Sequence, residues 1–148
     1  MPHQRYLYNA QTPDGVLIRR VLEFKGVSFT LGDSAPYGVH VHQPVYIDRE
    51  LVLPDTRVTI EYLEEKYPYP PLLPPDPDKR AWVRLLQKRV AEMIRENRRI
   101  DLDQVRRMLK NNRFIAGDSP CIIDLYLTTN GPNDIRVLLE RRLDEIAP

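Results

Sequence analysis

The chain has 148 residues, of which 42% are hydrophobic and 29% are charged, and its formal net charge is +1. This length suits one compact domain or two small packed ones that need no disulfide or metal to fold, and the single cysteine, Cys121, fits a reducing compartment. The near-neutral charge argues against a strongly basic nucleic-acid binder.

The first third of the chain alternates between strand and helix patterns. Residues 5–9 show the alternation of a short strand, followed by a turn. Residues 16–26 place apolar side chains at the spacing of an amphipathic helix, and Gly26 is the expected C-terminal stop. Residues 27–31 have strand composition. Residues 32–42 are rich in turn formers and show no helical period.

A β-hairpin and a helix are predicted next. Residues 44–53 contain two β-rich runs around Asp48-Arg49, which is a hairpin pattern. Pro54 and Asp55 then open a helix over residues 56–67. Its apolar side chains recur at helical spacing, at Ile60, Leu63 and Tyr67. Three glutamates are therefore expected to face water: Glu61, Glu64 and Glu65.

Residues 66–77, KYPYPPLLPPDP, hold six of the fourteen prolines. Such a segment can be a flexible linker, a polyproline ligand or a rigid joint. A flexible linker has no use for the apolar side chains of Tyr67, Leu72 and Leu73, and prolines hold an extended crossing at low entropic cost. We therefore interpret the segment as a rigid joint between two packed halves.

Only helices are predicted after the joint. Asp76 is a candidate N-cap with Pro77 at the first helical position. The buried stripe of this helix is expected to consist of Trp82, Leu85, Leu86, Val90, Met93 and Ile94. Shorter helices are expected over residues 101–111, 120–130 and 133–146, the last with Ile135, Leu138, Leu139 and Leu143 on one face.

These elements predict an α+β protein. Strands confined to the first half and helices to the second favour an α+β unit followed by a small all-helical unit. We place the first domain at residues 1–67, the joint at 68–77 and the helical domain at 78–148. The sequence has no apolar run of the roughly 18 residues that a membrane span needs, nor a signal-peptide core, so we expect a cytoplasmic protein.

The element order and one long segment resemble the glutathione transferase superfamily. Residues 43–81, QPVYIDRELVLPDTRVTIEYLEEKYPYPPLLPPDPDKRA, resemble the family's cis-proline hairpin, the next helix and the joint to its helical domain. Within the superfamily, DREL, EFKGVSF and EYLEEKYPYPPLLP look most like the stringent starvation protein A branch. The resemblance implies a thioredoxin-like N-terminal domain with a mixed sheet, followed by a shortened helical domain.

The resemblance also allows a test of whether the chain carries the catalytic group of a glutathione transferase. Glutathione transferases need a hydroxyl or thiol near the start of their first helix to stabilise the glutathione thiolate. Aligned on RRVLEFKG, that position is Gly15 in this chain. Thr12 and Tyr8 lie nearby but are misplaced, and Thr12 is expected to support the turn before Pro13. We therefore predict a non-catalytic protein with no catalytic residue.

Four residues match positions that hold glutathione in the family. Gln43 and Pro44 correspond to the family's cis-proline pair, whose backbone contacts the cysteinyl part of glutathione. Asp55 and Thr56 open a helix where an acid and a serine would grip the γ-glutamyl end, although capping explains them equally well. We treat the four as a vestigial glutathione site, and expect no other cofactor.

Partner binding is the main function that the resemblance implies. Stringent starvation protein A proteins bind RNA polymerase with its sigma factor, through a surface on the joint that carries a Pro-His-Pro triplet. The corresponding surface here is Pro68, Tyr69, Pro70 and Pro71, in which a tyrosine replaces the histidine. The alternatives are a glutathione-binding transferase-like enzyme with a degenerate site, and an assembly partner for a longer homologue. We expect a homodimer or heterodimer and no sequence-specific nucleic-acid binding.

The remaining candidate residues are explained by ordinary structural roles. Two starts are possible for the helix near Cys121: Ser119 as N-cap with Pro120 first, or Cys121 as N-cap with Asp124 as its reciprocal partner. In either case a buried, inert cysteine is expected. The histidines lack other ligands at metal-binding spacing, so no metal site is predicted.

Overall fold

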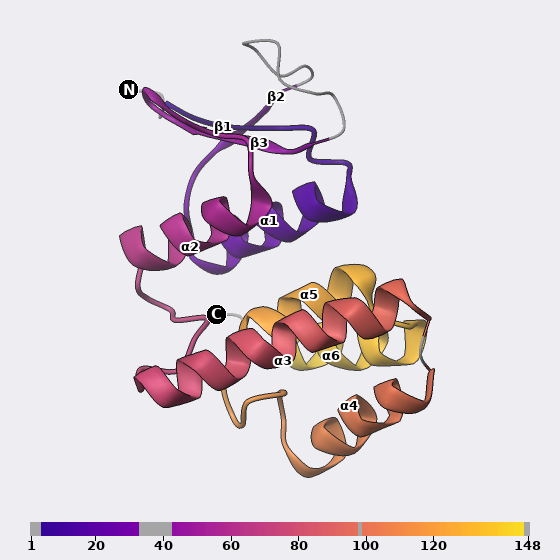
Figure 1. Ribbon diagram of the computed structural model, residues 1–148. Coiled ribbons are helices and arrows are strands. Elements are labelled where there is room, and N and C mark those ends of the chain that lie inside the picture. The colour runs from indigo at the N-terminus through magenta and orange to yellow at the C-terminus, as the bar shows by residue number, and fades with distance from the viewer. Residues whose placement is uncertain (1–3, 33–42, 98, 147–148) are drawn as a thin grey trace. The chain divides into compact units, whose positions relative to one another are not determined.

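The computed structural model describes residues 4–32, 43–97 and 99–146. The chain forms two compact units, Met1–Pro70 and Pro71–Pro148. The first contains a sheet with helices, and the second contains only helices among its described residues (Figure 1). This is the thioredoxin-like plus helical architecture that the sequence predicts.

The first unit is built on a mixed four-stranded sheet in the order β2-β1-β3-β4. β1 (Arg5–Tyr8) pairs in parallel with β2 (Thr30–Gly32) and antiparallel with β3 (Val45–Asp48), which continues into the antiparallel β4 (Leu51–Leu53). Helices α1 (Pro13–Phe24) and α2 (Thr56–Lys66) pack side by side on one face of the sheet (Figure 1). The largest fully buried side chains of this unit come from the sheet and from both helices: Leu7, Ile18, Leu22, Tyr46 and Leu63.

Helix α1 begins and ends at residues with clear capping roles. The hydroxyl of Thr12 accepts the Gly15 N–H at 3.0 Å, and Pro13 occupies the first turn. At the other end, Gly26 has φ +69°. The N–H groups of Gly26 and Val27 donate back to the carbonyls of Glu23 and Leu22, which is a Schellman motif. This motif confirms the predicted stop, and the strand predicted from residue 27 begins only at Thr30.

Helix α2 differs from the prediction in one important residue. Its buried positions are Thr59, Leu63 and Glu64, so the prediction that Glu64 faces water is wrong. The reason is Lys25, the C-cap residue of α1, whose ammonium lies 3.3 Å from the Glu64 carboxylate. An apolar pattern assigns a glutamate to the solvent face, because it carries no information about a buried cation elsewhere.

The second unit consists of α3 (Pro77–Arg95), α4 (Arg99–Asn111), α5 (Ile122–Asn130) and α6 (Asn133–Ile146). α5 is the most buried of them and packs against α3 and α6. Its apolar side chains form the centre of this unit together with Val83, Val90, Leu109, Ile135 and Leu139. As predicted, α6 buries Ile135 and Leu139; Leu138 and Leu143 are partly exposed.

The predicted buried stripe of α3 is partly wrong. Val83 and Val90 are the buried positions, whereas Trp82 and Leu85 are about half exposed. α3 contacts α5 and α4, and its buried side is the one that carries Val83 and Val90 rather than Trp82 and Leu85. Asp76 precedes the helix but makes no capping hydrogen bond; its carboxylate lies 3.6 Å from the Lys79 ammonium instead.

Polar side chains join α4 to α6. Arg106 donates to both carboxylate oxygens of Asp134, at 2.7 and 3.2 Å. Arg142 of α6 donates to the carbonyls of Leu109, Asn112 and Arg113 at the C-terminal end of α4. Arg106 and Arg142 thus help to hold this unit together.

Candidate functional site

The candidate partner-binding segment follows α2 directly. α2 ends at Lys66, and Pro68, Tyr69, Pro70 and Pro71 are all exposed. The side chain of Tyr69 is 81% exposed, the largest exposed fraction among the exposed large hydrophobic residues that the structure describes. The Tyr69–Pro70 peptide bond is cis. The segment therefore presents one aromatic ring, flanked by prolines, to solvent.

A buried ammonium group holds this segment in place. The Nζ of Lys25 donates to the carbonyl of Tyr67 at 2.6 Å and to that of Pro70 at 3.0 Å, and it pairs with Glu64. The Lys25 side chain has no exposed surface. Burial lowers the pKa of Lys25, and the Glu64 carboxylate opposes that shift. One cation thus fixes the carbonyls on both sides of Tyr69.

Sequence reasoning missed Lys25 altogether. In the sequence it is the last residue before a helix-stopping glycine, a position where a lysine ordinarily complements the helix dipole in water. Its partners lie 39 to 45 residues further along the chain. No local pattern identifies such a role, because the pairing exists only once α1 and α2 have packed.

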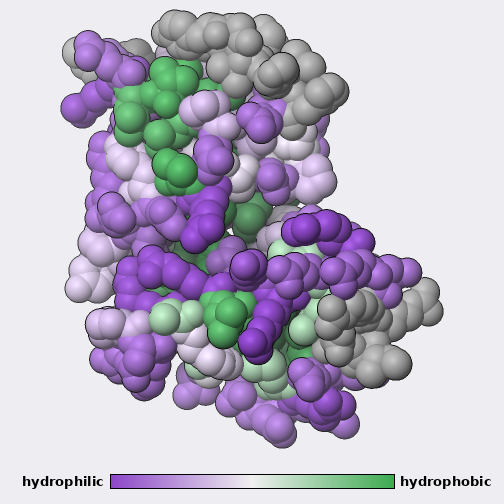
Figure 2. Space-filling view, in the orientation of Figure 1, coloured by the Kyte–Doolittle hydropathy of each residue, from purple (hydrophilic) through white to green (hydrophobic). Residues whose placement is uncertain are grey.

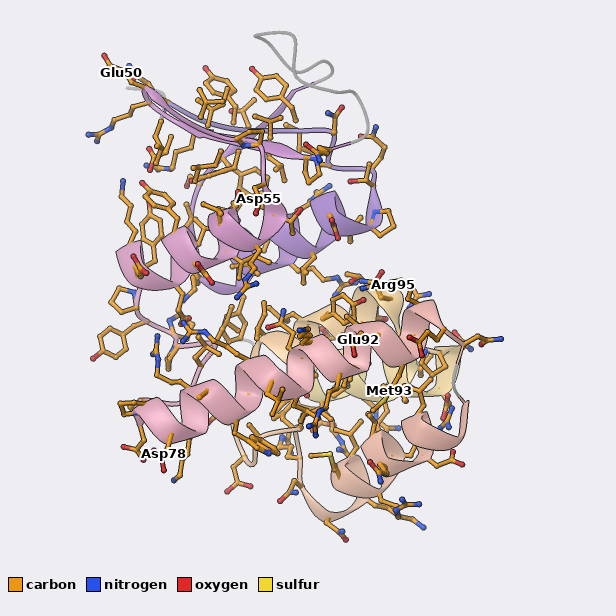
Figure 3. The ribbon with its side chains drawn as sticks, viewed as in Figure 1. Glu50, Asp55, Asp78, Glu92, Met93 and Arg95 are labelled. Carbon is orange, nitrogen blue, oxygen red and sulfur yellow. The ribbon has the colours of Figure 1, made fainter. Side chains whose placement is uncertain are left out.

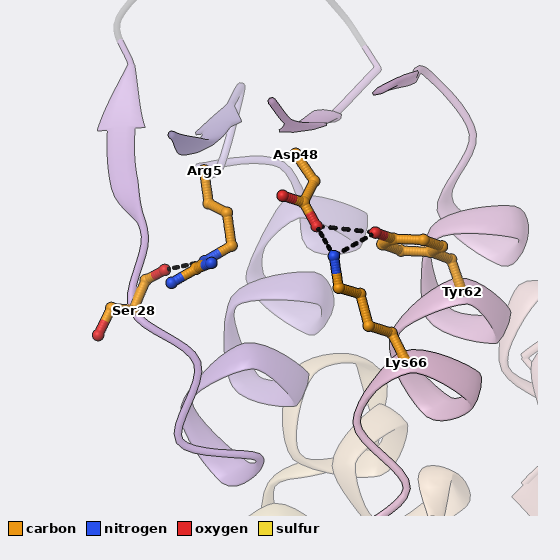
Figure 4. A network of polar contacts seen from close by, with 5 residues as sticks. All are labelled: Arg5, Ser28, Asp48, Tyr62 and Lys66. Atoms are coloured by element: carbon orange, nitrogen blue, oxygen red, sulfur yellow. Dashed lines mark hydrogen bonds and ion pairs between the residues drawn. The ribbon is translucent and has the colours of Figure 1, made fainter. Parts of the chain in front are cut away.

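A second network anchors the last turn of α2 to the sheet (Figure 4). Oδ2 of Asp48, at the end of β3, accepts from the Lys66 ammonium and from the Tyr62 hydroxyl, both at 2.7 Å. Burial alone would raise the pKa of Asp48, but these two hydrogen bonds outweigh it and keep that pKa below its ordinary value. The residues that lead into the exposed segment are therefore held by Asp48 of the sheet, which binds Lys66, and by Lys25, which binds the Tyr67 carbonyl.

The position of the family's catalytic hydroxyl has no room for a side chain. A Cβ on Gly15 would lie 2.4 Å from the Asn9 carbonyl oxygen and 2.7 Å from the Ala10 Cα, both backbone atoms. The nearby Thr12 hydroxyl is already engaged, since it accepts from the Gly15 N–H and donates to the Asn9 carbonyl. Neither residue offers a hydroxyl to a thiol.

The backbone beside Pro44 differs from the arrangement that the resemblance implies. Among the described residues the cis bond is Tyr69–Pro70, so the Gln43–Pro44 bond differs from the cis bond of the family's corresponding proline. The Gln43 carbonyl accepts a hydrogen bond of 2.7 Å from the Asn9 amide group. An internal partner thus occupies a backbone group that would pair with a bound peptide.

The other two candidate glutathione residues also have internal partners. Asp55, labelled at the start of α2 in Figure 3, caps that helix by accepting the Val58 N–H at 2.8 Å. The Thr56 hydroxyl donates to Oδ2 of Asp14 at 3.2 Å. A carboxylate ligand bound to Thr56 would meet the negative charge of Asp14. Most of the turn-rich segment predicted from the sequence, residues 33–42, lies outside the described residues.

Cys121 has a structural role. It is the N-cap of α5, and Asp124 is its reciprocal partner, so the second of the two predicted starts is correct. The Asp124 carboxylate accepts the N–H groups of Cys121 and Ile115 at 2.8 and 3.0 Å. Burial raises the pKa of the Cys121 thiol, which suppresses the reactive thiolate.

Two further features bear on metal and membrane binding. The three histidines lie outside the described residues, and within those residues no group of three or more His, Cys, Asp or Glu side chains could hold a metal ion. None of the described helices combines the length and apolar character that crossing a membrane requires.

Comparisons with curated proteins support the resemblance. No protein-family model matches the chain. It is 38% identical to a stringent starvation protein A homologue of Histophilus somni over 72 residues, which is 49% of this chain and 32% of that protein. It is 44% identical to the homologue of Coxiella burnetii over 82 residues, covering 49% of this chain and 39% of that protein. The matches therefore span about half of this chain and only 32% to 39% of those relatives.

Solved structures establish the fold. A glutathione S-transferase from Rhodospirillum rubrum matches with a TM-score of 0.73 at 21% identity, covering 98% of this chain and 89% of that one. A maleylacetoacetate isomerase from Anaeromyxobacter dehalogenans matches with a TM-score of 0.66 at 24% identity, covering 98% and 86%. The chain has the fold of the glutathione transferase superfamily.

Proposed function

We propose that this chain is a non-catalytic protein of the stringent starvation protein A type, which binds RNA polymerase holoenzyme in the cytoplasm and modulates transcription. The main observation behind this proposal is that Tyr69 is 81% exposed. The buried Lys25 ammonium binds the carbonyls of Tyr67 and Pro70, which lie on either side of Tyr69 in the sequence. The partial identity to stringent starvation protein A homologues supports the choice of partner. In this proposal Pro68, Tyr69, Pro70 and Pro71 form the contact surface.

The geometry suits recognition because the segment is ordered before it binds. Prolines restrict the backbone, and the Lys25 hydrogen bonds fix it further, so little conformational entropy remains to be lost on association. A tyrosine offers a large flat apolar surface with a polar tip, and such residues dominate binding energies at interfaces. We further propose that residues 68–77 act as the joint between the two domains.

The proposal of a non-catalytic protein has separate support. Gly15 leaves no room for a nucleophile or thiolate-stabilising group, and the Thr12 hydroxyl is engaged within the protein. Thr56 and the Gln43 carbonyl, two of the four candidate glutathione groups, have internal partners. A glutathione transferase would need these groups available to its substrate.

Replacing Tyr69 with alanine is expected to weaken retention of RNA polymerase holoenzyme at least tenfold, as for a central aromatic anchor. The measurement is a pull-down with purified holoenzyme, followed by surface plasmon resonance. Val137→Ala is the matched control, because Val137 is also exposed but lies on α6. Tyr69→His, which restores the family's triplet, is expected to retain binding. Lack of binding by the unmodified chain would rule out this partner.

Millimolar glutathione is expected to leave the melting temperature unchanged, because a ligand stabilises the folded state only when its concentration approaches the dissociation constant. Calorimetric titration and thermal unfolding measure this directly. Asp14→Asn is an informative variant, since it removes the carboxylate beside Thr56. Saturable heat with the unmodified chain would favour the alternative, a transferase-like enzyme with a degenerate site.

A further inference from the structure

The carbonyl of Leu72 is held close to the proposed contact surface by a second hydrogen-bond donor. It accepts the backbone N–H of Ile122 at 2.9 Å, and the Leu72 side chain is only 1% exposed. On the face drawn in Figure 2, hydrophilic side chains cover most of the helical unit, and apolar ones appear only in small areas. Leu72 is therefore a core residue, whereas Tyr69, a short distance before it in the sequence, belongs to the exposed surface.

The donor comes from a helix start whose position is already fixed. Ile122 is the first residue of α5, and an N–H at this position has no acceptor within its own helix. The Asp124 carboxylate accepts the N–H of Cys121, the preceding residue, at 2.8 Å. It also accepts the Ile115 N–H at 3.0 Å, which ties the preceding loop to the same turn. The joint thus supplies an acceptor to an N–H that the helix leaves unpaired, and the capping carboxylate keeps that N–H in place.

Only one residue separates the two sets of hydrogen bonds. Within the first unit Lys25 binds the carbonyl of Pro70, and within the second Ile122 binds the carbonyl of Leu72. The residue between them is Pro71, which is exposed and whose ring fixes its own φ angle. Few free torsion angles therefore remain between the two bound carbonyls. Each end of the contact surface is held by a different unit.

We propose that the Ile122 N–H is a positioning group for the contact surface, because it holds the Pro71 end while Lys25 holds the Tyr69 end. This inference rests on the proposed function, and it adds that the order of the surface depends on the start of α5. Ile122 itself is 3% exposed, so it acts through the joint and does not touch the partner. A surface that is ordered in advance loses less conformational entropy on binding. Loss of this hydrogen bond should therefore weaken partner binding without removing any contact residue.

Amide hydrogen exchange of the unmodified chain tests whether this hydrogen bond forms in solution. The Ile122 N–H is expected to exchange about a hundredfold more slowly than the Thr56 N–H. Thr56 is the matched reference, because it is likewise the first residue of its helix and its N–H has no acceptor among the described residues. Equal exchange of the two amides, after correction for their intrinsic rates, would mean that Leu72 does not pair with α5 and would overturn the proposal.

Two substitutions at Ile122 separate the role of its N–H from that of its side chain. Ile122→Pro removes the donor at a helical position that favours proline. Cys121 before it already has the extended conformation that a following proline favours, with φ −126° and ψ 177°. Ile122→Ala is the matched control, because it keeps the N–H and shortens the side chain further. Both variants lose buried side-chain carbon, so only Ile122→Pro should free the Leu72 carbonyl.

Backbone relaxation measured by NMR in the two variants reports on the joint. The two prolines that precede Leu72 have no N–H, so the amides of Leu72 and Leu73 are the nearest probes on that side of the contact surface. Their order parameters are expected to fall from about 0.85 to below about 0.6 in Ile122→Pro, and to stay near 0.85 in Ile122→Ala. Rigid Leu72 and Leu73 amides in Ile122→Pro, with α5 still folded, would overturn the proposal.

Holoenzyme binding, corrected for the folded fraction, connects the joint with the proposed function. Ile122→Pro is expected to bind about tenfold more weakly than the unmodified chain, because about one more residue must be ordered on association, and Ile122→Ala within about twofold. Equal weakening by both variants would assign the effect to lost side-chain packing and overturn the proposal. Absence of binding by the unmodified chain would instead reject the proposed partner, and the exchange and relaxation data would still decide whether Ile122 positions the joint.

Discussion

Replacing Lys25 with methionine is expected to lower the free energy of unfolding of the first unit by about 3–5 kcal/mol, the usual cost of removing one partner from a buried ion pair. The Lys25 side chain has no exposed surface, and its ammonium serves Glu64 and the carbonyls of Tyr67 and Pro70. Methionine preserves most of the volume, so the loss reports on the charge and its hydrogen bonds. Calorimetry and hydrogen exchange of peptides from residues 4–70 measure the effect.

Two comparisons make the Lys25 result specific. Lys79→Met applies the same substitution to a lysine whose side chain is 68% exposed, and it should change stability by less than about 0.5 kcal/mol. Lys25→Met combined with Glu64→Leu should recover part of the loss, because the buried carboxylate is removed together with its cation. Equal stability of Lys25→Met and the unmodified chain would mean that the pair contributes nothing.

The Lys25 variant also connects stability with the proposed function. In the folded fraction of the Lys25 variant, the carbonyls of Tyr67 and Pro70 lose their hydrogen bonds to the ammonium. The segment around Tyr69 then becomes ordered only on binding, and the loss of conformational entropy weakens the affinity. Holoenzyme binding should therefore weaken even after correction for the folded fraction. Unchanged binding by the folded fraction would show that Tyr69 needs no preordering.

Replacing Asp124 with alanine is expected to destabilise the helical unit by about 2–4 kcal/mol, because two buried N–H groups lose their acceptor. The carboxylate receives the N–H groups of Ile115 and Cys121, so it joins the loop before α5 to the start of that helix. Urea unfolding followed by Trp82 fluorescence reports on this unit, since the only tryptophan belongs to α3. An unchanged transition midpoint and slope would contradict this role.

Asp124 should also give the helical unit an unusual pH dependence. Burial raises the pKa of Asp124 from 3.8 to about 6, so between these values the folded state holds a proton that the unfolded state has released. Its contribution to the unfolding free energy is therefore largest below pH 3.8 and falls as the pH rises through about 6, by about 3 kcal/mol at most. Asp124→Asn should remove this slope, which urea unfolding of both proteins between these pH values measures.

Asp134 provides the opposite case as a control. Hydrogen bonds from Arg106 lower the pKa of Asp134, so its contribution is present above pH 3.8 and is lost as the pH falls below that value. Its carboxylate is largely exposed, so the effect of Asp134→Asn should be small. A pH slope that persists in Asp124→Asn would assign the dependence to another group.

The sequence identified some of the functionally relevant residues but not the structural properties that matter at them. The sequence singled out Pro68–Pro71 and the missing nucleophile at Gly15, because a short segment and a single aligned position carry those signals. It could not show that Tyr69 is the most exposed of the large hydrophobic residues that the structure describes, or that backbone atoms fill the space beside Gly15. It matched Gln43 and Pro44 to the family's cis-proline pair, whereas among the described residues the cis bond lies before Pro70.

The sequence by itself determined the features that depend on neighbours along the chain. Thr12 and Asp55 cap their helices, Gly26 ends α1, and the hairpin turns at residues 49–50, because hydrogen bonds and allowed φ values at these positions are set within a few residues. The order of strands and helices follows from the same local patterns, and it was sufficient to indicate the fold.

Only the tertiary structure decided which side of each helix is buried and which polar groups meet. Lys25 and Glu64, Asn9 and Gln43, and Asp14 and Thr56 are pairs separated by 34 to 42 residues. Helical periodicity defines an apolar stripe only to within about one residue, so Val83 rather than Trp82 became the buried position of α3 once α5 had packed against it. Long-range packing therefore brought the Lys25 ammonium to the carbonyls of Tyr67 and Pro70, and it left Trp82 half exposed.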